Sequence, residues 1–249
     1  SAGVGTDVLD DLTDRLWQAR GRSLVVCGIN DVGIQCLVNA INQLLDNYGN
    51  TLDLERPSNQ WKSDDRAMQD LLEAMRSGSV NALLIAGTNP AYSLPDAQAF
   101  TEATRQVPLT VTFTEYQDET ATASRYVCPT HHPLEAWNDA EIVSGVISVS
   151  QPAIRPIAQT RSLRECLTAW TTGSMQDDRL ILQAYWQESI YPRRENEMAF
   201  QAFWDQAVHD GYITVRSEGQ AAGTYQPSAT WPQPLAVSAT ADRFALTLY

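Results

Sequence analysis

The segment from residue 131 to 139 carries the most conspicuous group of polar side chains that could do chemistry. His131, His132, Glu135 and Asp139 combine imidazoles with carboxylates, the groups that bind zinc or pass protons. Adjacent histidines in an extended loop point to opposite sides, however, which favours a structural role over a metal site. Trp137 adds an aromatic of the kind enriched at protein interfaces. We therefore expect an interface rather than catalysis here, formed by His131, His132, Glu135, Trp137 and Asp139.

Two glycine-containing loops each follow an apolar run and are candidates for holding a nucleotide. The first is G-I-N-D-V-G at residues 28–33, and the second is G-T-N-P at residues 87–90. Glycine permits close backbone approach, and a free helix N-terminus can hold phosphate. If a residual cofactor site exists, we expect it to use Gly28, Asn30, Gly87, Thr88 and Asn89.

A simpler interpretation stands beside each of these loops. Asp31 would oppose an anion, and it can instead cap the following helix. Gly, Asn and Pro at residues 87–90 are also ordinary turn residues that need no ligand. A third loop, residues 114–119, carries Glu115, Asp118 and Glu119. These carboxylates could coordinate a metal, or they could favour the start of a helix near Thr120.

The four cysteines do not encode a metal centre. Cys27, Cys36, Cys128 and Cys166 include no C-x-x-C pair, whereas iron–sulfur and structural zinc sites draw on closely spaced cysteines. We expect neither iron nor molybdenum to be bound by this chain.

Composition excludes several classes of partner. The chain has 249 residues, a net charge of −13 and a hydrophobic fraction of 43%, enough for a full core. A surface this acidic repels the phosphate backbone of nucleic acids, and we therefore do not expect nucleic acid as a partner. No run approaches the roughly 20 apolar residues of a membrane span. The acidic N-terminus, residues 1–16, also lacks the basic and apolar regions of a signal peptide.

The elements that must position these residues alternate between strand and helix. Short apolar runs predict strands at 23–27, 80–86 and 109–113, and helical periods predict helices at 6–19, 34–47, 63–77 and 96–105. This alternation is typical of an α/β fold: a doubly wound, mainly parallel sheet with helices on both faces. Alternation at 142–149 indicates an edge hairpin, and helices are expected from 163, at 177–189 and at 196–209. We divide the chain into an N-terminal helix (1–20), an α/β domain (21–170) and a mostly helical C-terminal extension with an irregular tail (171–249).

Several strings in residues 21–170 resemble a known family. V-V-C-G-I-N, A-I-N-Q-L-L-D-N-Y-G-N-T-L and L-L-I-A-G-T-N-P-A-Y-S-L-P resemble the third domain of molybdopterin oxidoreductases of the dimethyl-sulfoxide-reductase family. In those enzymes, loops at G-T-N-P and after the next strand hold an arm of the molybdopterin guanine dinucleotide. D-E-T-A, H-H-P-L-E-A-W-N-D and S-Q-P-A-I-R-P are more specific, and they are similar to the iron–sulfur subunit of alternative complex III.

This resemblance implies a module of a respiratory, quinol-oxidising electron-transfer complex. In that family the molybdopterin-like region has lost its cofactor, and a further cysteine-rich domain carries the iron–sulfur clusters. The partners implied are a multihaem cytochrome and an integral membrane quinol-binding subunit, on the periplasmic side of the bacterial inner membrane. The module would then be a scaffold without chemistry of its own. The alternative is the dinucleotide-binding domain of a genuine molybdopterin guanine dinucleotide oxidoreductase. A third hypothesis is a free-standing nucleotide-binding domain.

Overall fold

The computed structural model describes residues 4–60 and 63–218, and these form two compact units. The first unit holds residues 4–57, and the second, Ser58–Glu218, holds the rest of the described chain. The boundaries expected near residues 20 and 170 do not coincide with this division, and they stay a prediction about domain organisation. Within the described residues, every helix is too short or too polar to span a bilayer.

The first unit contains two helices, α1 (Thr6–Gln18) and α2 (Val32–Leu44). The strand expected at 23–27 was wrong: this segment joins no ladder among the described residues. The side chain of Asn42 takes the place of a neighbouring strand. Its Oδ1 accepts from the Val25 N–H at 3.0 Å, and its Nδ2 donates to the Val25 carbonyl at 2.8 Å. Because a helix residue satisfies both backbone groups of Val25, this residue at the centre of 23–27 needs no strand partner.

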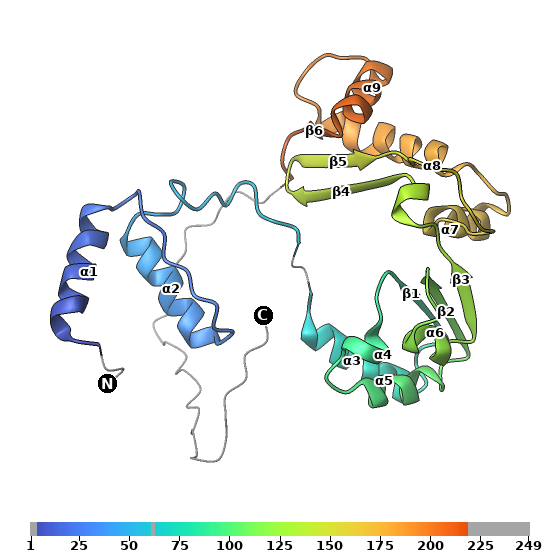
Figure 1. The fold of residues 1–249 in the computed structure, drawn as a ribbon, viewed down its shortest axis with the longest axis horizontal. Coiled ribbons are helices and arrows are strands. Elements are labelled where there is room, and N and C mark those ends of the chain that lie inside the picture. The colour runs from blue at the N-terminus through green and yellow to red at the C-terminus, as the bar shows by residue number, and fades with distance from the viewer. Residues whose placement is uncertain (1–3, 61–62, 219–249) are drawn as a thin grey trace. The chain divides into compact units, whose positions relative to one another are not determined.

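The expected parallel sheet lies in the second unit. Its strands are β1 (Ala82–Ala86), β2 (Leu109–Thr114) and β3 (Tyr126–Pro129), all parallel and in the order β1-β2-β3. Around it lie α3 (Asp65–Arg76), α4 (Pro90–Ser93), α5 (Ala97–Thr104) and α6 (Glu119–Ala123) (Figure 1). The α/β class with a parallel sheet is therefore confirmed. The N-cap of α3 is Asp64.

Helices cover both faces of this sheet. Ile85 of β1 packs in a cluster with Phe100 of α5. Ala86 points to the opposite face, because successive strand residues alternate, and its register partner on β2 is Phe113. The Phe113 ring lies 5.6 Å, centroid to centroid, from that of Trp170 on α7 (Leu163–Thr172). α7 therefore packs on the face opposite α5.

The expected hairpin is β4 (Asn138–Val143) and β5 (Val146–Ser150), and β6 (Tyr212–Thr214) extends it to an antiparallel sheet in the order β4-β5-β6. The turn between β4 and β5 requires glycine. Gly145 has φ +85°, and a Cβ there would lie 2.8 Å from the Val215 carbonyl oxygen. A side chain at position 145 would therefore push this sheet apart.

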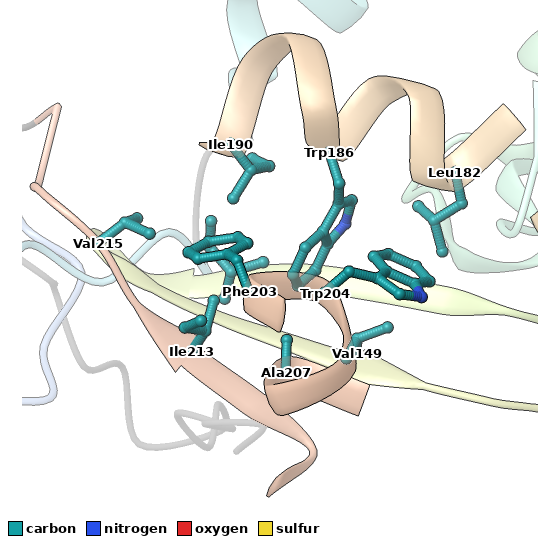
Figure 2. Packing of buried hydrophobic residues seen from close by; sticks show 10 residues of the cluster. Val149, Leu182, Trp186, Ile190, Phe203, Trp204, Ala207, Ile213 and Val215 are labelled. Carbon is teal, nitrogen blue, oxygen red and sulfur yellow. The ribbon is translucent and has the colours of Figure 1, made fainter. Parts of the chain in front are cut away.

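The helical C-terminal region is also confirmed over the described residues. After α7 come α8 (Asp178–Tyr185), a π turn (Trp186–Ile190), a 3₁₀ turn (Tyr191–Arg193) and α9 (Phe200–Asp210). These elements and the β4–β5–β6 sheet share a core rich in aromatic side chains (Figure 2). Trp186 and Trp204 stand at its centre with ring centroids 5.2 Å apart and planes at 88°, the edge-to-face geometry that aromatic quadrupoles favour.

Candidate functional site

A cavity of about 570 Å³ lies beyond the carboxyl ends of β1 and β2, where open parallel sheets bind their ligands. The G-T-N-P loop forms one side, and the loop after β2 forms another. The segment after β3 and the start of α7 complete it. Its polar and aromatic lining includes Gly87, Thr88, Asn89, Glu115, Tyr116, Asp118, His131, Trp137, Ser162 and Arg164.

Gly87 opens the loop after β1 with a left-handed backbone. Its φ is +64°, and nothing lies within 4 Å of the position a Cβ would take. Glycine is therefore required by the backbone conformation rather than by crowding. The expected residues Gly87, Thr88 and Asn89 are brought together at the cavity.

Asn89 joins this loop to α6. Its Oδ1 accepts from the Thr120 hydroxyl at 2.6 Å and from the Thr120 N–H at 3.3 Å. Its Nδ2 donates to Glu119 Oε2 at 2.7 Å, and this bond lowers the pKa of the Glu119 carboxyl. Both ends of the Asn89 amide are thus engaged by protein groups, and Thr120 is fully buried beneath it.

The carboxylates of the third loop start a helix, as the simpler interpretation predicted. Asp118 is the N-cap of α6, and its Oδ1 accepts from the Ala121 N–H at 2.7 Å. Glu119 stands in the first turn, where its charge complements the helix dipole. Glu115 remains exposed at the cavity, so two carboxylates, Glu115 and Asp118, face this space.

His131 is held between two partners on the far side of the cavity. Its Nδ1 lies 2.6 Å from the Thr160 hydroxyl, and its Nε2 lies 3.5 Å from Glu165 Oε2. Only 9% of the His131 side chain is exposed. Both ring nitrogens therefore have protein partners, as expected of a structural histidine.

Arg164 is the residue of the cavity lining whose charge would best suit an anionic ligand. Its guanidinium, however, already donates to other protein groups. It donates to both carboxylate oxygens of Asp178, at 3.0 and 3.1 Å, and to the carbonyl of Trp137. Asp178, which is 8% exposed, also accepts from the Ser162 hydroxyl at 2.7 Å. Bidentate pairing of this kind fixes both side chains.

The sequence did not single out Ser162, Arg164 or Asp178. A signal was present for Ser162: S-x-x-E at 162–165 is a capping box. In the structure the Ser162 hydroxyl accepts from the Glu165 N–H and the Glu165 carboxylate accepts from the Ser162 N–H. No local pattern could have paired Arg164 with Asp178, because they lie on different helices.

His132 and Glu135 cap a short turn, Pro133–Glu135, instead of facing the cavity. His132 Nδ1 accepts from the Leu134 N–H at 3.1 Å, and Glu135 accepts from the His132 N–H at 3.2 Å. Glu135 also accepts from the Ile157 N–H at 3.0 Å. This last bond is the largest cause of the lowered pKa of Glu135.

Trp137 and Asp139 join the segment to the aromatic core. The Trp137 ring lies 5.8 Å from that of Trp204, and the Arg179 guanidinium lies 5.8 Å from its centroid. Asp139 accepts from the Trp186 indole N–H at 3.0 Å. All five residues expected at an interface therefore have intramolecular contacts, and their contact with a partner stays a prediction.

Gly28 and Asn30 lie in the first unit, whereas the described residues that line the cavity all belong to the second. Asp31 caps α2, where its carboxylate accepts from the Ile34 N–H at 3.0 Å, as the simpler interpretation predicted. The side-chain amide of Gln35 holds the start of the 28–33 loop by donating to the carbonyls of Cys27 and Ile29, at 2.9 and 2.7 Å.

Two of the four cysteines, Cys128 and Cys166, favour the neutral thiol in the absence of a metal. Burial raises the pKa of the Cys128 and Cys166 thiols, whereas a metal ligand must be a thiolate. Among residues 4–60 and 63–218, no three His, Cys, Asp or Glu side chains are grouped to hold a metal ion.

Comparison with known proteins gives a partial relationship. No protein-family model matches the chain. A stretch of 164 residues is 30% identical to the menaquinone reductase, molybdopterin-binding-like subunit of Nitratidesulfovibrio vulgaris (strain Hildenborough). The match covers 61% of this chain and 23% of that subunit, so this chain spans less than a quarter of its relative's length. The similarity supports a relationship to molybdopterin oxidoreductase-like proteins.

Proposed function

We propose that this chain is a scaffold module in a subunit of a respiratory, quinone-linked electron-transfer complex and carries no cofactor of its own. The respiratory assignment is supported by the similarity to a menaquinone reductase subunit. The finer assignment, to a quinol-oxidising complex like alternative complex III, is supported by the H-H-P-L-E-A-W-N-D and S-Q-P-A-I-R-P strings. The partners are then a multihaem cytochrome and an integral membrane quinol-binding subunit, on the periplasmic side of the bacterial inner membrane. Iron–sulfur clusters would belong to the parent subunit.

The observation that carries the scaffold proposal is that three polar side chains of the cavity lining, Asn89, His131 and Arg164, are already bound by protein groups outside the lining. Asn89 is bound to Glu119 and Thr120, His131 to Thr160 and Glu165, and Arg164 to Asp178. A guanine dinucleotide needs donors for its pyrophosphate and polar partners for its base. To supply them, these side chains would have to leave carboxylates and buried hydroxyls without partners, which is unfavourable.

The charges around the cavity also disfavour a bound dinucleotide. The two basic side chains among the described residues of the cavity lining, His131 and Arg164, each already face a carboxylate, and Glu115 and Asp118 add negative charge. A pyrophosphate in this cavity would meet a net repulsive field. The residues present therefore do not fit the molybdopterin guanine dinucleotide.

Purification of the protein from its native host tests the proposed function. The full-length protein containing this sequence should be isolated from solubilised membranes with its neighbours, and quinol oxidation should be measured on the assembly. We expect co-purification with c-type haem and a quinol-binding membrane subunit. A protein that purifies alone, with no quinol-oxidising partner, would contradict the proposal.

The alternative is a genuine dinucleotide-binding domain, and the open space above Gly87 favours it. Titration with guanine nucleotide to millimolar concentration, where a Kd of 1 mM corresponds to about −4 kcal/mol, separates the two. We expect no heat and no thermal shift. Saturable binding that is lost in Gly87→Val would establish the alternative.

A further inference from the structure

Two of the four cysteines lie on the same side of the parallel sheet. Cys128 of β3 is the register partner of Phe113 on β2, so these two side chains point to one face. The Phe113 ring contacts that of Trp170, as described above, and α7 therefore covers this face. Cys166 precedes Trp170 by about one turn of the same helix, so both lie on the side of α7 that faces the sheet. The strand register and the helical period thus direct both thiols into one interface, between β3 and α7.

Contacts beside the two cysteines hold β3 and the start of α7 together. The Arg161 N–H, just before α7, donates to the carbonyl of Pro129 at 3.1 Å, and Pro129 follows the cysteine of β3. His131 and Glu165 lie 3.5 Å apart, as described above, and Glu165 precedes the cysteine of α7. Both contacts therefore involve a residue next to one of the cysteines, and they fix the interface into which the thiols point.

The two thiols are partly buried and near each other. Burial raises the pKa of both, and the second cause of the raised pKa of Cys166 is the charge of Cys128, an effect that a like charge has at short distance. Two thiols are too few for structural zinc or for an iron–sulfur cluster, each of which takes four ligands. In the part of the chain that the structure describes, no third His, Cys, Asp or Glu side chain joins them in a metal-binding group. The covalent product open to such a pair is a disulfide.

We propose that Cys128 and Cys166 form a disulfide that fastens α7 to the parallel sheet. The oxidant is another disulfide, from a small molecule or a protein. One cysteine thiolate attacks a sulfur of that disulfide, which forms a mixed disulfide and releases one thiol. The second cysteine attacks the mixed disulfide, the bond between the two Sγ atoms forms, and a second thiol leaves. Two electrons and the two cysteine protons thus pass to the oxidant, which is reduced to two thiols.

The oxidising compartment comes from the proposed function, on which the formation of this bond in the cell rests. Disulfides form and persist in the bacterial periplasm. Because both thiols favour the protonated form, they exchange slowly, as expected of a structural link rather than of an exchange catalyst. Ser162 and Arg164, around the start of α7, line the cavity. The disulfide would therefore also fix the side of the cavity that α7 forms.

The test identifies linked peptides in the full-length protein purified from its native host. Free thiols are alkylated at lysis, and the protein is digested with trypsin without reduction. Cleavage after each arginine that does not precede proline places Cys128 in peptide 126–161 and Cys166 in peptide 165–179, so mass spectrometry distinguishes the linked pair from either peptide alone. A second sample is reduced and then incubated with oxidised glutathione before alkylation.

We expect the two peptides to be linked in most of the native protein and to link again with oxidised glutathione after reduction. Reduction should lower the melting temperature on the order of 5 °C, because the unfolded chain regains the freedom of the loop between the cysteines. Cys128→Ser and Cys166→Ser should melt near the reduced wild type and lose this response to reduction. The matched control, Cys27→Ser, changes a partly buried cysteine of the first unit and should keep the response.

Alkylation of both cysteines in the native protein, with no link after oxidised glutathione, would overturn the disulfide and leave the proposed function intact. A link from either cysteine to a different cysteine would overturn the disulfide as well. A link that forms only with oxidised glutathione would support the pairing and contradict the periplasmic location in the proposed function. The peptide maps need only the wild-type protein, so they decide between these outcomes even if a serine variant does not fold.

Discussion

The two hydrophobic clusters of the second unit differ in what fills them. The cluster under the parallel sheet is built from small and aliphatic side chains with one aromatic: Met75, Ile85, Phe100, Ala103 and Val107. The cluster against the antiparallel sheet centres on Trp186, Trp204 and Phe203 (Figure 2). The partly buried Trp137 and Tyr191 pack against it. The parallel half has a cavity at its strand ends, whereas the aromatic half holds Trp137, which lines that cavity and packs against Trp204. The comparison shows that one wall of the cavity depends on the packing of the aromatic half.

The largest effect should come from the aromatic cluster. Trp204→Ala removes a side chain that is 1% exposed and contacts Trp186 and Trp137. We expect the free energy of unfolding to fall by about 3–5 kcal/mol, measured by urea denaturation. Because Trp137 lines the cavity, the variant should also loosen the segment around His131. A fall of less than about 1 kcal/mol would mean that this cluster is not the main core.

Substitutions in the cluster under the parallel sheet should lower the free energy of unfolding by less. Met75→Ala deletes a fully buried side chain from α3, and an expected loss of about 2–4 kcal/mol follows from the cavity left behind. Measured in the same denaturant, Met75→Leu should lose less than about 1.5 kcal/mol because it conserves volume. If Met75→Ala proved more damaging than Trp204→Ala, the ranking of the two clusters would be reversed.

Breaking the hydrogen bonds between the G-T-N-P loop and α6 should lower the free energy of unfolding by a smaller amount. Asn89→Ala removes the acceptor of the Thr120 hydroxyl, and we expect a loss of about 1–3 kcal/mol. Asn89→Asp keeps the acceptor but places a carboxylate 2.7 Å from Glu119, where the Asn89 amide now donates, so it should also destabilise. A stable Asn89→Ala variant would free this residue for a ligand role and weaken the scaffold account.

The 151–161 loop should show the mildest effect, one that depends on pH. Hydrogen bonding to the Ile157 N–H holds the pKa of Glu135 below its ordinary value of 4.5, with the His132 N–H and the nearby His131 and His132 charges acting in the same direction. A depressed carboxyl pKa stabilises the folded loop above pH 4.5, and this stability is lost as pH falls through the folded pKa. The Ile157 amide resonance should therefore broaden or shift on acidification, and Glu135→Gln should remove that transition. A transition unchanged in Glu135→Gln would assign it to another group.

The sequence predicted the elements of the second unit better than their side-chain partners. Periodicity located β1, β2, α5 and the β4–β5 hairpin, because the apolar residues of each element recur with the period of a strand or of a helix. Periodicity failed at 23–27. There the side-chain amide of Asn42, a residue on a helix, binds the N–H and the carbonyl of Val25 in place of a second strand. A strand is defined by its neighbour, and no local pattern records which neighbour a segment has.

The candidate site was predicted in part for the same reason. The G-T-N-P loop could be placed at the end of a strand by its order along the chain. The engagement of Asn89 with Thr120, 31 residues away, depends on tertiary packing and carries no local signal. The interpretations that needed only nearby residues, the caps formed by Asp31 and Asp118, were confirmed.

The central claim is that the main polar side chains lining the cavity beyond β1 and β2 are engaged by other protein groups and that the cavity holds no dinucleotide. The most direct measurement is the guanine nucleotide released by acid from the full-length protein purified from its native host, with molybdenum determined on the same sample. The account predicts that neither is present in stoichiometric amount. One guanine nucleotide per protein, absent from an Asn89→Ala variant that still folds, would contradict it.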